Sequence, residues 1–378
     1  MQAKCYGGGS MHEEFCTLFD FHYLPRAIVL YKSLAEHCAA FRLRCLCMDV
    51  HAERSLRRME LPGLEVIPLS ELEEHDGELL AVKRERSHAE YCWTAASALC
   101  TYALKRDPAL EMITYLDADL EFFASPSPLF DELGDGSVLL SPHRCSLEFT
   151  AALGPDGVPD EPGGLYNVQF TTFRRDREGS AALAWWRSRC IEWCRDRFER
   201  GRYAGQKYLD EMPGMFPGVR TLDHLGAGLA PWNVSQYRLE QPGDQILVNG
   251  VPLIFSHFQS LKMHRGTRAA RALARMTHAY RFTSGPIPLI WTTGWRLTER
   301  ELSLLWDPYM DRVSEACGDV VATLETDDVS GAPLRPAQVA FQLIRRRVPI
   351  AVRNTFWDAR AAVWRRRGGL SDASRQLA

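Results

Sequence analysis

Apolar residues along roughly the first two thirds of the chain follow two periods in alternation. Short, continuous apolar runs are typical of strands buried on both faces of a parallel sheet, and stretches with apolar residues at helical spacing lie between them. The apolar runs occupy residues 15–20, 42–50, 64–69, 113–116, 138–141, 166–173 and 252–258. The helical spacing is clearest over residues 23–37, 83–104 and 181–199. Strands alternating with helices predict an α/β fold with a mostly parallel sheet flanked by helices.

The alternation stops near residue 286, where helical patterns remain alone over 297–318 and 336–361. We therefore predict an α/β domain over 12–285 and a helical C-terminal extension over 286–378. The end of this extension is basic, with aromatic and aliphatic residues among the arginines. These residues are Arg345, Arg346, Arg347, Val352, Arg353, Phe356, Trp357, Arg360, Val363, Trp364, Arg365, Arg366 and Arg367. Such a helix predicts peripheral docking on an anionic membrane surface; an RNA-binding tail and a merely solvated helix are the alternatives.

The bulk composition narrows the class of protein. With 378 residues, a formal net charge of −3 and 46% hydrophobic residues, the chain suits a large folded domain with a smaller appendage, and it is neither disordered nor strongly basic. No apolar run approaches the roughly 20 residues of a membrane span, and residues 1–10 are not a signal peptide. The 11 cysteines include no Cys-x-x-Cys pair, which predicts a reduced, cytoplasmic protein.

Two carboxylates directly follow the apolar run 113–116. Asp117 and Asp119 are separated by the small Ala118, so an extended or tightly turned segment lets both side chains reach one cation. Ligands of α/β proteins gather at the carboxyl ends of such strands, and Mg²⁺ and Mn²⁺ take oxygen ligands while holding substrate phosphates. The alternative is that one Asp caps a helix and the other is solvated.

The sequence Leu116-Asp117-Ala118-Asp119 resembles the metal-binding Asp-x-Asp of GT-A nucleotide-sugar glycosyltransferases, most of all the bacterial relatives of glycosyltransferase family 8. Neither Gly-x-Gly-x-x-Gly nor Gly-x-x-x-x-Gly-Lys follows a predicted strand, so dinucleotide and P-loop folds lose their main support. The resemblance covers about residues 15–265. It implies a Rossmann-like GT-A domain, a nucleotide-sugar donor and a divalent cation, Mn²⁺ or Mg²⁺.

The same resemblance implies a third metal ligand late in the domain. His257 lies near the end of the apolar run 252–258 and matches the family's C-terminal His, which joins Asp117 and Asp119 on the metal. Lys262 matches a Lys that contacts the diphosphate, but the Gly expected between the two is missing and the spacing is one residue shorter. A lone His after an apolar run is otherwise structural.

Residues after the first predicted strand are candidates for nucleotide binding. Phe19, Asp20 and Tyr23 stand where a base can stack and form hydrogen bonds, and the resemblance implies the same place for the nucleotide. The alternative is that Asp20 caps the next helix and the aromatic rings belong to the core.

A helix start is predicted near residue 87. Ser87 and Glu90 have the spacing of a capping box. A helix N-terminus beside cationic residues suits phosphate, so Arg86 is a candidate for the diphosphate; a solvated charge run is the alternative.

Three residues are expected near the donor sugar. Asn167 begins a predicted strand that resembles the family strand whose Asn approaches the sugar. Trp232 and Asn233 follow several small residues, which favours a tight loop that presents a stacking face and an amide. A strand-start Asn and a packed turn with a buried Trp are the alternatives.

Candidate catalytic residues lie in the segment 205–213. In the family an Asp-Gln pair heads a helix against the anomeric carbon; here Gln206 is present but Gly205 precedes it. On a helix, Asp210 lies one turn from Gln206 on the same face. Retaining chemistry would use Gln206 beside the oxocarbenium-like centre, whereas inverting chemistry would use Asp210 as the base for the acceptor hydroxyl.

The sequence thus predicts a metal-dependent glycosyltransferase that moves a sugar, most simply from a UDP-sugar, to a glycan, lipid-linked or other hydroxyl acceptor. Bacterial cell-surface polysaccharide synthesis is the expected setting, in the cytoplasm or at the inner face of the membrane, without nucleic acid as a partner. The alternatives are a nucleotidyltransferase that uses the same acids, and a non-catalytic protein that binds membrane or nucleic acid through its Arg-rich tail.

Overall fold

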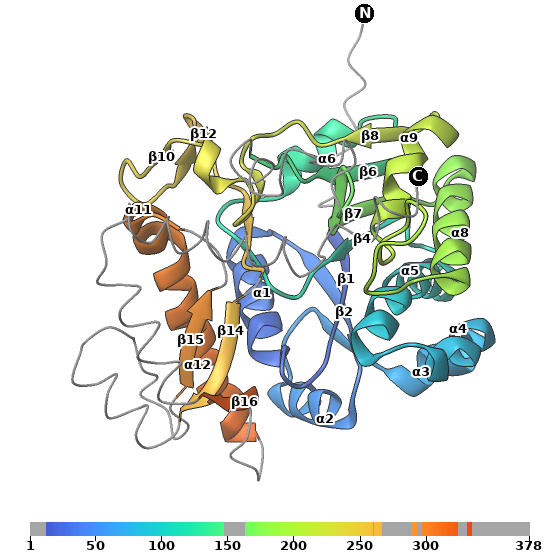
Figure 1. Ribbon diagram of the computed structural model, residues 1–378, viewed down its shortest axis with the longest axis horizontal. Helices are drawn as coiled ribbons and strands as arrows, with labels where there is room; N and C mark the ends of the chain where they lie inside the picture. Colours follow the sequence, from blue (N-terminus) through green and yellow to red (C-terminus); the bar gives the residue numbers. More distant parts are fainter. Residues whose placement is uncertain are drawn as a thin grey trace, which may run out of the picture.

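The centre of the molecule is a seven-stranded sheet with the order β3-β2-β1-β4-β7-β6-β8 (Figure 1). The computed structural model describes residues 13–146, 163–259, 261–266, 289–293, 297–323 and 331–334, with only the backbone over 262–266, 289–293 and 331–334. The strands of the sheet are β1 (Glu13–Phe19), β2 (Phe41–Cys47), β3 (Leu64–Pro68), β4 (Met112–Leu116), β6 (Val138–Pro142), β7 (Tyr166–Arg174) and β8 (Val219–Thr221). Only β7 runs antiparallel to its neighbours β4 and β6, and the other pairs are parallel. The predicted α/β class is confirmed.

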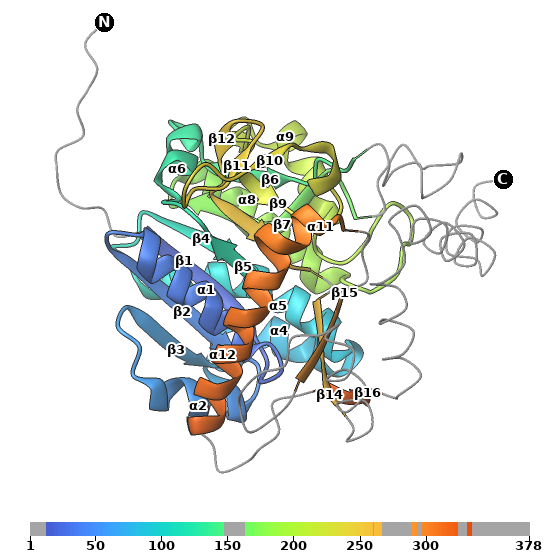
Figure 2. The same ribbon diagram turned by 90° about the vertical axis from the view of Figure 1, so that its left-hand side faces the viewer.

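Helices cover both faces of this sheet (Figures 1 and 2). One face carries α1 (Leu24–His37), α2 (Val50–Met59) and α12 (Asp307–Thr323), and the other carries α5 (His88–Arg106) and α8 (Arg177–Glu192). Strand β1 shows why both faces are covered: Phe15 and Phe19 enter one core, and Cys16 and Leu18 enter the other. A strand with two buried faces gives the continuous apolar run seen in the sequence.

Shorter elements complete the described chain. The helical ones are α3 (Leu69–His75), α4 (Gly77–Val82), η1 (Lys83–Glu85), α6 (Ser127–Leu133), η2 (Lys207–Glu211), α9 (Met212–Met215), η3 (Val234–Gln236), α11 (Glu299–Glu301) and η4 (Leu302–Trp306). The short strands are β5 (Leu120–Phe122), β9 (Ala227–Leu229), β10 (Leu239–Glu240), β11 (Leu247–Val248), β12 (Val251–Pro252), β13 (Phe255–His257), β14 (Leu261–Gly266), β15 (Leu289–Thr293) and β16 (Gly331–Leu334). In the part of the chain that the structure describes, no helix has the length and apolarity needed to cross a bilayer.

The small sheet β5-β13-β9 brings the two predicted halves of the metal cluster together. Strand β4 ends at Leu116, the chain turns through the Asp-x-Asp, and β5 then pairs antiparallel with β13. His257 is thereby the register partner of Leu120, and the Phe258 N–H donates to the Asp119 carbonyl at 3.0 Å. Backbone pairing therefore fixes His257 beside the acids.

The C-terminal segment packs on the same side as α1. Figure 2 shows α12 running along α1, and Lys32 pairs with Asp319 at 2.7 Å. The Tyr309 ring stacks on Phe258 with 3.7 Å between the ring centroids. The predicted extension also holds strands β15 and β16, which pair with β14 and were not predicted. The Arg-rich helix predicted over 336–361 lies outside the described residues, and the boundary near residue 286 stays a prediction.

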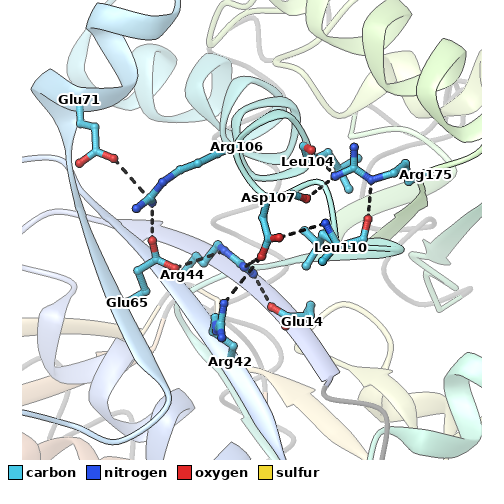
Figure 3. A network of polar contacts seen from close by, with 11 residues as sticks. Glu14, Arg42, Arg44, Glu65, Glu71, Leu104, Arg106, Asp107, Leu110 and Arg175 are labelled. Atoms are coloured by element: carbon cyan, nitrogen blue, oxygen red, sulfur yellow. Dashed lines mark hydrogen bonds and ion pairs between the residues drawn. The ribbon is translucent and has the colours of Figure 1, made fainter.

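An ionic network joins the amino-terminal ends of the parallel strands (Figure 3). The Arg44 side chain, 3% exposed, contacts Glu14, Glu65 at 3.4 Å and Asp107 at 3.1 Å. Arg175 donates to backbone carbonyls of the chain that follows α5 and leads into β4. Acids at this edge of the sheet are thus matched by guanidinium groups.

Candidate functional site

The cluster of Asp117, Asp119 and His257 lies at the carboxyl end of β4. One ligand atom from each side chain can be chosen so that all three lie within 4.8 Å of one another. His257 Nε2 is 3.0 Å from Asp119 Oδ1 and 3.8 Å from Asp117 Oδ2. Asp119 and His257 are buried, whereas the Asp117 side chain is 29% exposed. The cluster therefore opens to solvent on the side of Asp117.

A buried glutamine orients His257. Gln169 Oε1 lies 2.7 Å from His257 Nδ1, and Gln169 Nε2 donates to Ser141 Oγ at 3.0 Å. Because an amide oxygen only accepts, the Nδ1 atom of His257 carries hydrogen and Nε2 faces the two acids. Gly228, at φ +77°, packs against the Gln169 side chain. A Cβ at this position would lie 2.7 Å from Gln169 Nε2, so a larger residue would collide with it.

The charges of the cluster depend on one another. Burial raises the pKa of Asp117 to about 6, which His257 opposes and Asp119 reinforces. For Asp119, burial acts to raise the pKa, but His257, Arg26 and a backbone hydrogen bond together hold the pKa below its usual value. For His257, burial acts to lower the pKa, but Asp119 and Asp117 together offset it and the pKa is raised.

Two carboxylates and one imidazole suit a divalent cation. Carboxylate oxygen and imidazole nitrogen together are ligands for Mn²⁺. Because His257 Nδ1 donates to Gln169, His257 Nε2 would bind the metal through its lone pair once the proton on Nε2 is displaced. The residues present therefore fit the cation that the resemblance implies.

A cavity of about 370 Å³ extends from this cluster. Eight of the residues proposed from the sequence lie in its wall: Phe19, Asp20, Tyr23, Asp117, Asp119, Asn167, Gln206 and His257. Further lining residues were not predicted, among them His88, Cys92, Trp93, Ala96 and Tyr203. Among the described residues that line it, acids are present but Lys and Arg are absent. The acids of the wall are therefore accompanied by the imidazoles of His88 and His257, without a Lys or Arg side chain in the described lining.

Asp20 lies at the cavity wall and in the turn before α1, whose N-cap is Tyr23 and not Asp20. Its Oδ1 accepts from the Tyr23 N–H at 3.0 Å at the start of α1, and its Oδ2 lies 3.0 Å from His88 Nε2. Tyr23 is 43% exposed at the cavity, whereas Phe19 is buried. His88 is the first residue of α5, whose N-terminus carries the predicted capping box of Ser87 and Glu90. His88 thus contributes an imidazole to the cavity wall, and this residue was not predicted from the sequence.

The wall around Gln206 explains the missing acid at position 205. The Gly205 carbonyl accepts from Trp186 Nε1 at 2.8 Å, and a Cβ on Gly205 would lie 2.9 Å from Cys190 Sγ. A side chain at this position has to displace a buried thiol. Gly205 is therefore a packing requirement of this chain.

The predicted helical relation between Gln206 and Asp210 was wrong. Residues Lys207–Glu211 form a 3₁₀ helix, in which residues four apart do not share a face. Asp210 Oδ1 accepts from the N–H groups of Leu165 at 2.7 Å and Tyr166 at 3.3 Å. Its other oxygen pairs with Lys207 at 2.9 Å. Asp210 thus anchors the entry to β7 and is not among the residues that line the cavity.

Three more residues proposed from the sequence, Arg86, Trp232 and Asn233, are not among the described residues that line the cavity. Arg86 is buried and donates to the Ile191 carbonyl at 2.9 Å. The Trp232 indole donates to the His143 carbonyl at 2.9 Å. The Trp232 ring packs edge-on against the His257 ring, with 5.3 Å between the ring centroids. Asn233 is buried and hydrogen-bonded to backbone groups alone among the described residues. The Lys262 side chain lies outside those described.

The fold and the cluster define an α/β protein with an acid–histidine site at the carboxyl edge of its sheet. The chain belongs to the family of YfnF and YfnD of Bacillus subtilis (strain 168), both named as uncharacterized proteins. It is 34% identical to YfnF over 254 residues, which span 67% of this chain and 83% of YfnF. It is 31% identical to YfnD over 251 residues, 66% of this chain and 78% of YfnD. No protein-family model matches the sequence.

The solved structures to which the chain is similar include two glycosyltransferases. Mouse xyloside xylosyltransferase 1 matches with a TM-score of 0.42 and 15% identity over 66% of this chain and 98% of that protein. The galactosyltransferase LgtC, in complex with donor and acceptor sugar analogues, matches with a TM-score of 0.42 and 18% identity over 65% and 87%. These likenesses concern the fold, and they carry no substrate over to this chain.

Proposed function

We propose that the chain is a divalent-cation-dependent glycosyltransferase that takes its sugar from a nucleoside diphosphate. The observation that carries the proposal is the charge of the cavity: three carboxylates, Asp20, Asp117 and Asp119, line it without Lys or Arg among the described residues. Two negative charges a few ångströms apart repel strongly at low dielectric, so a diphosphate needs a cation between itself and these acids.

Asp117, Asp119 and His257 would hold this cation. Mn²⁺ is favoured over Mg²⁺ because an imidazole nitrogen joins the oxygen ligands. When bound, the metal supplies Lewis-acid stabilisation to the leaving diphosphate. The contact of Gln169 with Nδ1 keeps the His257 ring in the orientation that this binding needs.

Phe19, Asp20 and Tyr23 are proposed to bind the nucleoside, with UDP as the nucleotide that the resemblance suggests. The half-exposed Tyr23 ring offers a stacking face at the cavity. Asp20 offers a carboxylate oxygen, already beside His88, for a hydrogen bond. All three residues come from the β1–α1 junction, so one short segment presents the base site.

Gln206 and Asn167 are proposed to face the donor sugar, because both line the same cavity as the acids. Asp210 is engaged by two backbone N–H groups and by Lys207, which supports the retaining alternative over a route with Asp210 as base. In the retaining route Gln206 lies beside the oxocarbenium-like centre.

For the acceptor we propose a glycan or lipid-linked hydroxyl in cell-surface polysaccharide synthesis, with the protein in the cytoplasm or at the inner face of the membrane. This part rests on the family 8 resemblance and on the Arg-rich tail, which lies outside the described residues.

The test is a thermal-shift screen of the full chain against UDP-glucose, UDP-galactose, UDP-xylose and GDP-mannose, each with MnCl₂ or EDTA. A true donor raises the melting temperature by mass action. The proposal predicts a shift that needs Mn²⁺, disappears in Asp117→Ala, and is followed by release of UDP or GDP. Nucleotide-sugar binding that is equally strong in EDTA would contradict it, and so would an unchanged response of Asp117→Ala.

A further inference from the structure

His143 is the polar centre of the cavity wall behind Gln206. It follows strand β6 and is 7% exposed. Its Nε2 lies 3.0 Å from Asn167 Nδ2 and 3.4 Å from Gln206 Nε2. Its backbone carbonyl accepts from Trp232 Nε1 and Asn233 Nδ2, each at 2.9 Å. The proposed function gives this residue no role, although two of its partners face the cavity.

The two amide contacts define the state of the imidazole. Both partners of His143 Nε2 are amide nitrogens, which only donate, so Nε2 carries a lone pair and the ring is neutral. Burial lowers the pKa of His143 to about 4. The ring therefore remains an acceptor throughout the neutral pH range.

This acceptor determines which end of the Gln206 amide faces away from the wall. Gln206 Nε2 donates to the Gly163 carbonyl at 2.6 Å and also meets His143. An amide carries its oxygen opposite its nitrogen, so the Gln206 oxygen is left for the cavity that Gln206 lines. A rotated amide would set its oxygen against the Gly163 carbonyl oxygen and the His143 lone pair, both of which repel it.

The same imidazole is connected to the metal cluster through hydrogen bonds. Asn167 donates to His143 and accepts at Oδ1 from the Gln169 N–H at 2.9 Å. The Gln169 side chain in turn accepts at Oε1 beside His257 Nδ1, 2.7 Å away. One chain of contacts thus runs from Gln206 to the metal-ligating histidine.

We propose that His143 is a positioning residue that holds the Gln206 carbonyl oxygen toward the reacting sugar and aligns it with the metal cluster. The inference rests on the proposed function. Positive charge develops at the anomeric carbon as its bond to the diphosphate breaks, and an oriented carbonyl dipole stabilises this charge at no cost of reorganisation. An amide N–H in the same place would oppose it.

The experiment compares His143→Asn with His143→Gln in the full chain. A Gln amide reaches the position of the imidazole Nε2 and can accept there, whereas an Asn amide ends near the position of Nδ1. Both variants are polar amides that differ by one methylene group, so the melting temperature of each protein serves as the control for packing. The readout is Mn²⁺-dependent release of UDP from UDP-glucose, UDP-galactose and UDP-xylose, with kcat, KM and the melting temperature measured for each protein.

We expect His143→Asn to lower kcat by about tenfold to a hundredfold, since a small misplacement of a reacting group has an effect of this size. The donor KM should stay unchanged, and His143→Gln should restore most of kcat. In a Gln206→Ala background, His143→Asn should have no further effect, because the two residues act as one unit.

Three results would each overturn the positioning role. They are equal decreases in kcat in the Asn and Gln variants, an increase in KM with kcat unchanged, and additive decreases in kcat in the double variant. Wild-type protein that releases no UDP from any of these donors and no GDP from GDP-mannose contradicts the proposed function instead, so the two failures are distinguishable. A His143→Asn protein that fails to fold leaves the comparison of His143→Gln with wild type: a His143→Gln variant that folds but has lost kcat overturns the inference.

Discussion

The two edges of the central sheet carry acids in opposite surroundings. At the amino-terminal edge, Arg44 lies among Glu14, Glu65 and Asp107, and each acid has a guanidinium partner (Figure 3). At the carboxyl-terminal edge, the acids of the cavity have imidazoles beside them, and Lys and Arg are absent from its described lining. The first arrangement is complete without a ligand. The second has imidazoles but no Lys or Arg in its described lining, which is why we assign it to a cation and its diphosphate.

The largest expected effect is at the carboxyl-terminal edge. Asp119→Asn keeps the shape of the side chain but removes the charge that a cation needs, so turnover should fall by about a hundredfold or more. The measurement is Mn²⁺-dependent UDP release. Arg42→Met is the control at the opposite edge, where the side chain is 49% exposed and its loss should leave turnover unchanged. A full rate in Asp119→Asn would remove the functional distinction between the edges.

The next effect concerns stability at the amino-terminal edge. Arg44→Met removes the shared cation from several partly buried acids, and losing one partner of a buried ion pair costs about 3 kcal/mol of unfolding free energy. Arg42→Met removes an exposed pair with Asp107, which costs about 0.5 kcal/mol. Urea unfolding of both variants measures the difference. Equal losses would mean that the burial of Arg44 does not determine its contribution.

Gly205→Asp restores the acid that the family pattern carries at this position. Its Cβ would lie 2.9 Å from Cys190 Sγ, and overpacking of this kind costs about 2 kcal/mol. We therefore expect a lower melting temperature and no gain in UDP release. A gain in turnover at unchanged stability would show that the wall has room for an acid.

The smallest effect is a pH dependence. Burial raises the pKa of Glu121 to about 7, although Arg312 opposes this. Because the pKa of Glu121 is higher in the folded protein than in the unfolded chain, its protonation stabilises the folded state. This stabilisation is complete below the unfolded pKa and is lost as pH rises toward 7. The melting temperature of wild type should therefore fall more between about pH 5 and about pH 8 than that of Glu121→Gln. Parallel curves would contradict this.

The sequence was sufficient to predict features that depend on local patterns. Apolar runs predicted six of the seven strands of the main sheet, because strands such as β1 are buried on both faces. The short strand β8 was not predicted, and the run 252–258 lies in two smaller sheets. The capping box of Ser87 and Glu90 is formed as its spacing predicts. The acids Asp117 and Asp119 and the distant His257 could be brought together only through the family resemblance. The pairing of β5 with β13 supplies the physical reason for their proximity.

Other parts of the site depend on long-range contacts that no local pattern records. Gln169 and His143 act through partners far along the chain, so neither was predicted. In the sequence Arg86 lies beside a helix N-terminus, where a phosphate-binding residue is expected, but in the structure its side chain donates to the Ile191 carbonyl. Asp210 was misplaced because the segment winds as a 3₁₀ helix.

The most direct test of the central claim is calorimetric titration of UDP into the full chain, with MnCl₂ and with EDTA. The two acids and His257, in a described cavity lining that holds no Lys or Arg, predict that UDP binds only with Mn²⁺, and that Asp119→Asn abolishes this binding while Arg42→Met retains it. UDP binding of equal affinity in EDTA would contradict the claim, because the anionic cavity would then accept a diphosphate without a cation.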